Sequence, residues 1–134
     1  MKLFKRNRAI VIVSVNRKDR SEYENARAFE LAHQYLDTSK VPYVVGQGYY
    51  DGVHEPVLCT QYGYGSFARE LAEANEQDCI LYVDAGYVAE YGHRENGYKQ
   101  ADDPVGLWRN IPDWEARQSD AWTEISGRFY KIVD

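Results

Sequence analysis

Acidic and amide side chains stand at a point of the sequence where folding does not require them. The run Glu76, Gln77, Asp78 and Cys79 follows an amphipathic stretch and leads directly into an apolar one, with no glycine or proline between them. Such a run could supply carboxylates for acid–base chemistry, or an amide that donates to a ligand and accepts from it at once. The same side chains could also simply cap a helix end and face solvent.

Glu55 is a second candidate, because it stands at the start of an apolar stretch that is typical of a strand. The ordinary interpretation is an edge-strand glutamate that faces solvent beside Pro56. Tyr49 and Tyr50 precede it in the glycine-rich segment 46–52. Half-buried strand faces would explain most of the 12 tyrosines in the chain. An aromatic wall around a ligand, such as a cationic one, is the functional alternative.

Several kinds of site find no support in the sequence. The serines have no histidine nearby, and the three histidines are scattered, without the spacing of zinc ligands. Cys59 and Cys79 each lie in an apolar run, which indicates buried free thiols in a reducing cytoplasm. Segment 46–52 lacks both the GxGxxG spacing and the lysine of a phosphate-binding loop. We therefore expect no metal and no cofactor.

Length and composition predict one globular domain over residues 1–134. The chain has 44% apolar residues and a formal net charge of −5, which argues against a nucleic-acid partner. A basic start is followed by the short β-branched run 9–15, which favours a core strand over an export signal. No segment is long enough to span a bilayer, so we expect a cytoplasmic protein with no membrane partner.

The predicted elements follow the order β-α-β-β-α-β with further β structure after them. Strands are expected over 9–15, 41–45, 53–60, 79–83 and 87–91, helices over 21–37 and 67–75, and a closing hairpin over 122–125 and 128–133. Ser21 and Glu24 predict a capping box at the first helix. Residues 92–120 are expected to be mostly irregular, and Pro42 suggests that the second strand is an edge.

This order predicts an α+β fold, a ferredoxin-like β-α-β-β-α-β two-layer sandwich with an extra C-terminal β-hairpin. A doubly wound parallel sheet is the alternative, and the short link between the second and third strands disfavours it. The open face of such a sheet needs a cover, which could be the C-terminal tail or a neighbouring subunit. We therefore expect an oligomer.

Parts of the chain resemble a known family. The segment from Phe67 to Tyr82, with its Glu-Gln-Asp-Cys run, resembles a helix-to-strand segment of the phage-encoded S-adenosylmethionine lyases, long called S-adenosylmethionine hydrolases. The first strand, 11–16, is similar, as is the segment from Gly48 through Glu55 to Cys59. The resemblance covers about residues 9–83.

The resemblance also implies roles for four residues. Glu55 matches the essential glutamate of the family, and Tyr50 matches its active-site tyrosine, with the adjacent Tyr49 as a rival. Gln77 matches a functional glutamine. These matches imply catalytic roles for Glu55 and Tyr50 and substrate-binding roles for Gln77 and Tyr49.

The family further implies a small α/β sandwich that forms homotrimers with active sites between subunits. Its reaction converts S-adenosylmethionine to 5′-methylthioadenosine and homoserine lactone. In an infected bacterial host this depletes the methyl donor and disarms the restriction that depends on it. The substrate's own carboxylate can displace the sulfonium, so positioning would contribute more than acid–base chemistry.

Three other functions stay open on the sequence. Glu55 could act as a general base for hydrolysis of S-adenosylmethionine to homoserine. The chain could bind a nucleotide without converting it. It could instead be a protein-interaction factor that uses the acidic, tryptophan-bearing segment 102–122.

Overall fold

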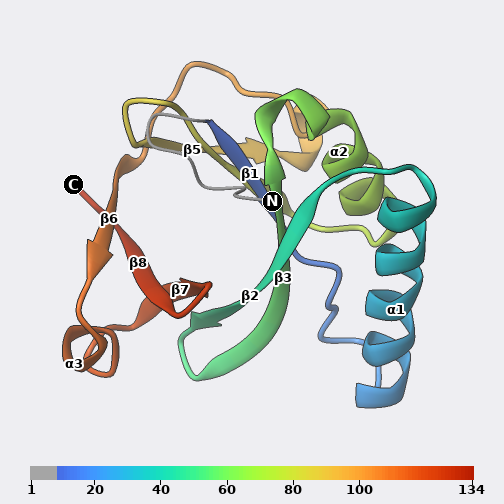
Figure 1. The fold of residues 1–134 in the computed structure, drawn as a ribbon, viewed down its shortest axis with the longest axis horizontal. Coiled ribbons are helices and arrows are strands. Elements are labelled where there is room, and N and C mark those ends of the chain that lie inside the picture. The colour runs from blue at the N-terminus through green and yellow to red at the C-terminus, as the bar shows by residue number, and fades with distance from the viewer. Residues whose placement is uncertain (1–8) are drawn as a thin grey trace.

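A single antiparallel sheet, closed into an eight-stranded barrel, forms the body of the computed structural model, which describes residues 9–134 (Figure 1). The strands are β1 (Ile10–Val13), β2 (Tyr43–Tyr50), β3 (Val53–Gln61), β4 (Cys79–Val83), β5 (Val88–His93), β6 (Gly106–Ile111), β7 (Ala121–Ile125) and β8 (Arg128–Val133). The helices are α1 (Glu22–Thr38), α2 (Gly65–Ala74) and α3 (Asp113–Ala116), with 3₁₀ turns at Tyr62–Tyr64 and Arg94–Asn96. Around the barrel the order is β1-β3-β2-β7-β8-β6-β5-β4, and β4 pairs with β1.

The predicted ferredoxin-like two-layer sandwich is wrong. Strands β4, β1, β3 and β2 do lie side by side, but both edges of this group are paired, β2 with β7 and β4 with β5. The remaining strands continue the sheet until it closes, so its second face becomes the interior of the barrel. The C-terminal tail therefore covers the second face of the sheet. The sequence alone leaves this role to either the tail or a neighbouring subunit. The doubly wound alternative fails as well, since every pairing is antiparallel.

Two local predictions failed for identifiable reasons. Pro42 precedes β2, which pairs with β3 along its whole length and with β7 from Gly46 to Tyr50, so the strand is not a free edge of the sheet. The glycine-rich segment is mostly strand, since β2 runs to Tyr50 and only Asp51 and Gly52 form the turn, with φ values of 48° and 85°. A glycine is required at Gly46, where a Cβ would lie 2.3 Å from the carbonyl oxygen of Glu124 on β7. Gly46 therefore allows the close approach of β2 and β7.

Helix α1 begins as the sequence predicts. The Ser21 hydroxyl accepts from the Glu24 amide at 3.1 Å, and the Ser21 amide donates to the Glu24 carboxylate at 2.9 Å. Helix α2 begins at Gly65, two residues before the predicted start at residue 67, with Tyr64 as its N-cap residue. None of the helices described in residues 9–134 is long and apolar enough to cross a membrane.

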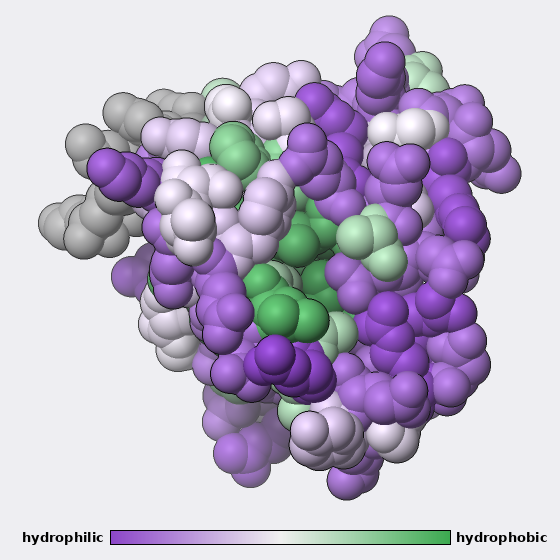
Figure 2. All heavy atoms as spheres, turned by 90° about the vertical axis from the view of Figure 1, so that its right-hand side faces the viewer, coloured by the Kyte–Doolittle hydropathy of each residue, from purple (hydrophilic) through white to green (hydrophobic). Residues whose placement is uncertain are grey.

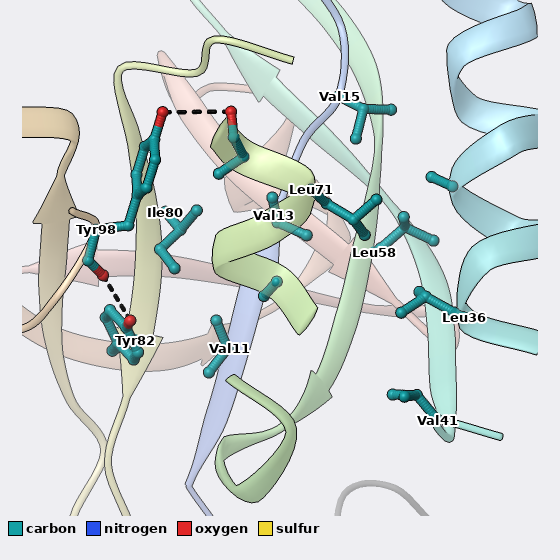
Figure 3. Close-up of a cluster of buried hydrophobic side chains, with 13 residues drawn as sticks. Val11, Val13, Val15, Leu36, Val41, Leu58, Leu71, Ile80, Tyr82 and Tyr98 are labelled. Atoms are coloured by element: carbon teal, nitrogen blue, oxygen red, sulfur yellow. Dashed lines mark hydrogen bonds between the residues drawn. The ribbon is translucent and has the colours of Figure 1, made fainter. Parts of the chain in front are cut away.

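Two hydrophobic cores lie on opposite faces of the sheet. Alternate residues of β1 divide between them, with Val11, Val13 and Val15 facing the helices and Ile10 and Ile12 facing the barrel interior. Figure 3 shows the outer core, in which α2 lies over β1 and Leu36 of α1 packs in the same cluster as Leu58 of β3. On the face that carries α1, hydrophobic residues lie in a central hollow ringed by hydrophilic ones (Figure 2).

The segment after β5 is fastened to the outer core by tyrosines. The Tyr98 hydroxyl donates to the carbonyl oxygen of Ala72 at 3.2 Å and to that of Gln77 at 2.7 Å. The Tyr82 hydroxyl donates to the carbonyl oxygen of Tyr98 at 2.6 Å (Figure 3). These bonds fix the joint between α2 and β4, which lies next to the candidate site described below.

Candidate functional site

One mouth of the barrel brings together residues from β1, β3 and β4. In the sheet Ile12 stands opposite Cys59 on β3 and opposite Leu81 on β4. Two residues further along, the same register places Ser14 level with Cys79, next to the strand that carries Glu55. The exit of β1 and the entries of β3 and β4 therefore meet at this mouth.

Glu55 faces the interior at this mouth. It lies on the same face of β3 as Val57 and Cys59, which pack in the inner core. Its partner across the sheet is Gly48, which has no side chain. A Cβ at Gly48 would lie 3.3 Å from Val57 Cγ1 and 3.8 Å from Glu55 Cγ. The glycine therefore leaves space next to the carboxylate.

The electrostatic environment of Glu55 favours an external cation. Burial raises the pKa of the Glu55 carboxyl, and the Ser14 hydroxyl opposes this rise. Within residues 9–134 the carboxylate forms no ion pair. A half-buried carboxylate that lacks a cationic partner binds a positively charged ligand favourably, because the ligand offsets part of its lost hydration.

Tyr50 and Tyr49 point to opposite sides of the sheet. Tyr50 lies two residues after Gly48, on the same face as Glu55, and is 72% exposed at the rim of the mouth. Tyr49 faces outward, where its ring stacks on Trp122 at a centroid distance of 5.3 Å. The structure thus brings Tyr50 and Glu55 to one mouth and places Tyr49 on the outer surface.

Gln77 lies at the joint between α2 and β4, and its side chain bonds to the backbone. Its amide nitrogen donates to the carbonyl oxygen of Asn16 at 2.8 Å. This bond ties the segment after β1 to the segment before β4. Gln77 therefore stabilises the backbone next to the mouth, at the residues that precede Cys79.

The acidic residues around Gln77 are on the surface. Glu76 has a left-handed backbone with φ of 51° and forms ion pairs with Arg17 and with Arg94, the latter at 3.4 Å. The guanidinium of Arg17 lowers the pKa of the Glu76 carboxyl. Asp78 is exposed. This charged cluster holds the joint in place, and its carboxylates do not face the barrel interior.

Sequence reasoning missed two side chains of the mouth, Ser14 and Tyr91. Tyr91 stands opposite the inward-facing Leu81 and is half-buried. Burial raises its pKa, and Cys79 and Tyr50 raise it further, which places all three at the same mouth. The alternation of Ala89, Tyr91 and His93 was the available signal, but it identifies a face only when the partner strand is known.

The other ionisable groups at the mouth are not set up for nucleophilic or metal chemistry. Burial raises the pKa of the Cys79 thiol, and Asp78 and Glu55 raise it further, so the thiol is protonated at neutral pH. In the part of the chain that the structure describes, no three His, Cys, Asp or Glu side chains are placed to hold a metal ion. The arrangement is suited to binding and orienting a cationic substrate.

Comparison with known proteins agrees with this chemistry. The model of the S-adenosylmethionine lyase family matches residues 11–133. The match therefore takes in the whole mouth and the C-terminal strands that close the barrel, well beyond the segments that carry the resemblance in the sequence. A search of curated proteins gave no significant match. Because the family model covers nearly the whole chain, the chain belongs to the S-adenosylmethionine lyase family and is an enzyme that cleaves S-adenosylmethionine.

Proposed function

We propose that the protein cleaves S-adenosylmethionine by intramolecular lactonisation at the mouth that contains Glu55. The carboxylate oxygen of the substrate attacks its own γ-carbon, the bond from that carbon to sulfur breaks, and the electron pair stays on sulfur. The products are 5′-methylthioadenosine and L-homoserine lactone, and neither water nor a proton is consumed. The observation that carries the proposal is a half-buried carboxylate without an ion-pair partner in residues 9–134, in a chain of this family.

In this proposal Glu55 anchors the positive part of the substrate. Its carboxylate binds the methionine ammonium or the ribose hydroxyls and leaves the substrate carboxylate free to fold back onto the γ-carbon. Holding the two reacting groups in contact replaces an improbable chain conformation with the reactive one. The reaction neutralises the sulfonium and the carboxylate, so the low polarity of the barrel mouth favours the transition state over the ground state.

The tyrosines contribute a second kind of contact. Tyr50 lies against the sulfonium from the β2 side, where a ring face attracts a cation. Tyr49 acts indirectly, because its stacking on Trp122 holds the end of β2 in place. Gln77 positions the entry of β4 through its bond to Asn16.

We also propose a homotrimer with the mouths between subunits, as the family resemblance implies. The exposed apolar side chains on the turn next to Glu55 support this, since Tyr50 is 72% and Val53 52% exposed. In an infected bacterial host the enzyme would deplete the methyl donor in the cytoplasm. This depletion would disarm the restriction that depends on the methyl donor. Sedimentation equilibrium tests the assembly, with three times the 15.5 kDa chain mass as the expected result.

The reaction is tested in water enriched in oxygen-18. The wild type should release 5′-methylthioadenosine together with unlabelled homoserine lactone, and later opening of the lactone should place the label only in the carboxyl group. Label in the γ-hydroxyl group would instead show hydrolysis with Glu55 as general base. Unchanged S-adenosylmethionine despite measurable binding would indicate a non-catalytic binding protein.

A further inference from the structure

A cavity of about 440 Å³ lies at the turn between β4 and β5, at the other end of β4 from Cys79. It is lined by side chains and backbone of Gly86, Tyr87, Leu107, Trp108, Arg109, Asn110, Arg128 and Tyr130. Trp108 and Tyr130 both belong to the inner core, and their rings stack at 5.2 Å with an interplanar angle of 9°. The cavity therefore has an aromatic floor at the mouth of the barrel opposite Glu55.

The rim of this cavity carries uncompensated positive charge. Arg109 and Arg128 both line it, and neither forms an ion pair with any carboxylate of residues 9–134. Asp84, the acid of the adjoining turn, accepts from the amides of Gly86 at 2.8 Å and Val88 at 3.0 Å. In a chain whose formal charge is −5, two guanidinium groups that form no ion pair within residues 9–134, beside an aromatic floor, are a local exception.

Tyr87 adds a strained backbone to the rim. Its φ is 64°, a left-handed conformation that is unfavourable for an aromatic residue. The carbonyl oxygen of Tyr87 accepts from the Trp108 amide at 2.8 Å, which holds the turn against β6. Tyr87 lines the cavity and is 47% exposed. Backbone strain of this kind is concentrated at ligand-binding positions.

We propose that this cavity binds a planar aromatic anion of the nucleoside phosphate class, independently of the lyase site. The base packs against the rings of Tyr87 and Tyr130, and the two guanidinium groups bind the phosphate, for which their planar donor geometry is suited. The cavity volume lies within the range of small-molecule sites. Stacking does not select one base, so the class is defined by the ring and the anion together.

Calorimetric titration of the wild type with AMP, adenosine and inorganic phosphate tests this site. AMP should bind at least ~10-fold more tightly than either fragment, because it alone uses both the rings and the arginines. The double variant Arg109→Gln/Arg128→Gln should reduce AMP affinity to that of adenosine. Arg117→Gln, which changes the exposed arginine that follows α3 and does not line the cavity, is the control and should leave AMP affinity unchanged. Circular dichroism confirms that each variant is folded.

Two results would overturn the proposal. One is the absence of AMP binding by the wild type, or AMP binding that the double arginine variant leaves unchanged. The other is an AMP affinity that Glu55→Gln lowers as much as the double arginine variant does, which would place AMP at the Glu55 mouth. Undiminished AMP affinity in Glu55→Gln supports a separate site.

Discussion

Glu55 and Glu90 are two glutamates of the same sheet that the fold treats in opposite ways. Glu90 on β5 is only 6% exposed, yet its carboxylate accepts from the amides of Ala101 and Asp103, both at 2.8 Å, and from the Gln100 side chain at 3.0 Å. Glu55 is half-buried and has no such set of donors. A fully bonded carboxylate fixes the chain around it, whereas a buried carboxylate that lacks partners is available to a ligand.

The pKa shifts of the two carboxyls follow this difference. Burial alone would raise the pKa of Glu90, but the hydrogen bonds from Asp103, Ala101 and Gln100 and the amide of Asp102 together outweigh it and lower the pKa. Glu90 therefore contributes stability above its unfolded pKa, and this contribution is lost as the pH falls through its folded value. For Glu55 the effect of burial exceeds the opposing effect of the Ser14 hydroxyl, and the pKa rises. Ionisation of Glu55 therefore destabilises the fold as the pH increases through the raised pKa.

Replacing each of the two glutamates by leucine should give the largest difference between the two positions, measured as the change in the free energy of unfolding. Glu90→Leu leaves two buried amides without an acceptor and should lower the free energy of unfolding by about 3 kcal/mol at neutral pH. Glu55→Leu should leave stability unchanged or slightly increased, because it removes a desolvated charge. Urea denaturation measures both. Equal losses for the two variants would remove the distinction on which the account is based.

Tyr50 and Tyr49 provide the next contrast, between the two faces of one strand. Tyr50→Leu should lower kcat/KM by about 10-fold, through loss of the ring face that contacts the sulfonium. Tyr50→Phe should retain most activity, since it keeps that face. Tyr49→Leu should change kcat/KM by less than about 3-fold and act mainly on stability. A larger effect at Tyr49 would show that the outer face of β2 belongs to the site.

Gly48 tests whether the space beside Glu55 is used. Gly48→Ala adds a methyl group 3.3 Å from Val57 Cγ1 and close to the Glu55 side chain. We expect KM to rise about 3-fold with little change in stability, because the neighbouring side chains must shift only slightly. Gly63→Ala, where nothing lies within 4 Å of the new methyl group, is the control. Identical kinetics for the two variants would show that substrate does not occupy this space.

Ser14 should have the smallest effect, visible in the pH profile. Because the raised pKa of Glu55 belongs to the free enzyme, kcat/KM should fall as the pH decreases through that value. The Ser14 hydroxyl opposes the rise, so Ser14→Ala should move the acidic limb to higher pH. Glu55→Gln should abolish this limb in any residual activity. If the acidic limb of the kcat/KM profile stays at the same pH in Ser14→Ala, the Ser14 hydroxyl does not interact with the Glu55 carboxylate.

The sequence predicted the first part of the molecule better than the second. Helix α1 with its capping box, and the strands around Ile12, Leu58 and Leu81, follow from clear periodicity and end signals. Strand β6 lies in the segment expected to be mostly irregular, and it could not be placed because Arg109 and Asn110, which are both exposed, interrupt its apolar pattern. Without β6 the chain could not be seen to close, so the sheet was predicted to be open.

The site was predictable in its residues more than in its arrangement. Glu55 and Tyr50 were identified by resemblance, and whether they act in the reaction stays a prediction. The choice between Tyr49 and Tyr50 depends on which face of β2 points inward, and this requires the register with β3. Ser14 and Tyr91 are distant in sequence from Glu55, so their place at the same mouth follows only from the strand pairings of β1, β3, β4 and β5.

The most direct test of the account is the rate of 5′-methylthioadenosine formation by Glu55→Gln, followed chromatographically and corrected for the folded fraction. We predict a loss of at least ~100-fold relative to the wild type, as expected when a preorganised charge is removed from a site. Glu124→Gln, a half-buried strand glutamate whose neighbour Ile125 packs in the inner core, should stay close to wild type. A folded Glu55→Gln variant that forms methylthioadenosine at the wild-type rate would contradict the account.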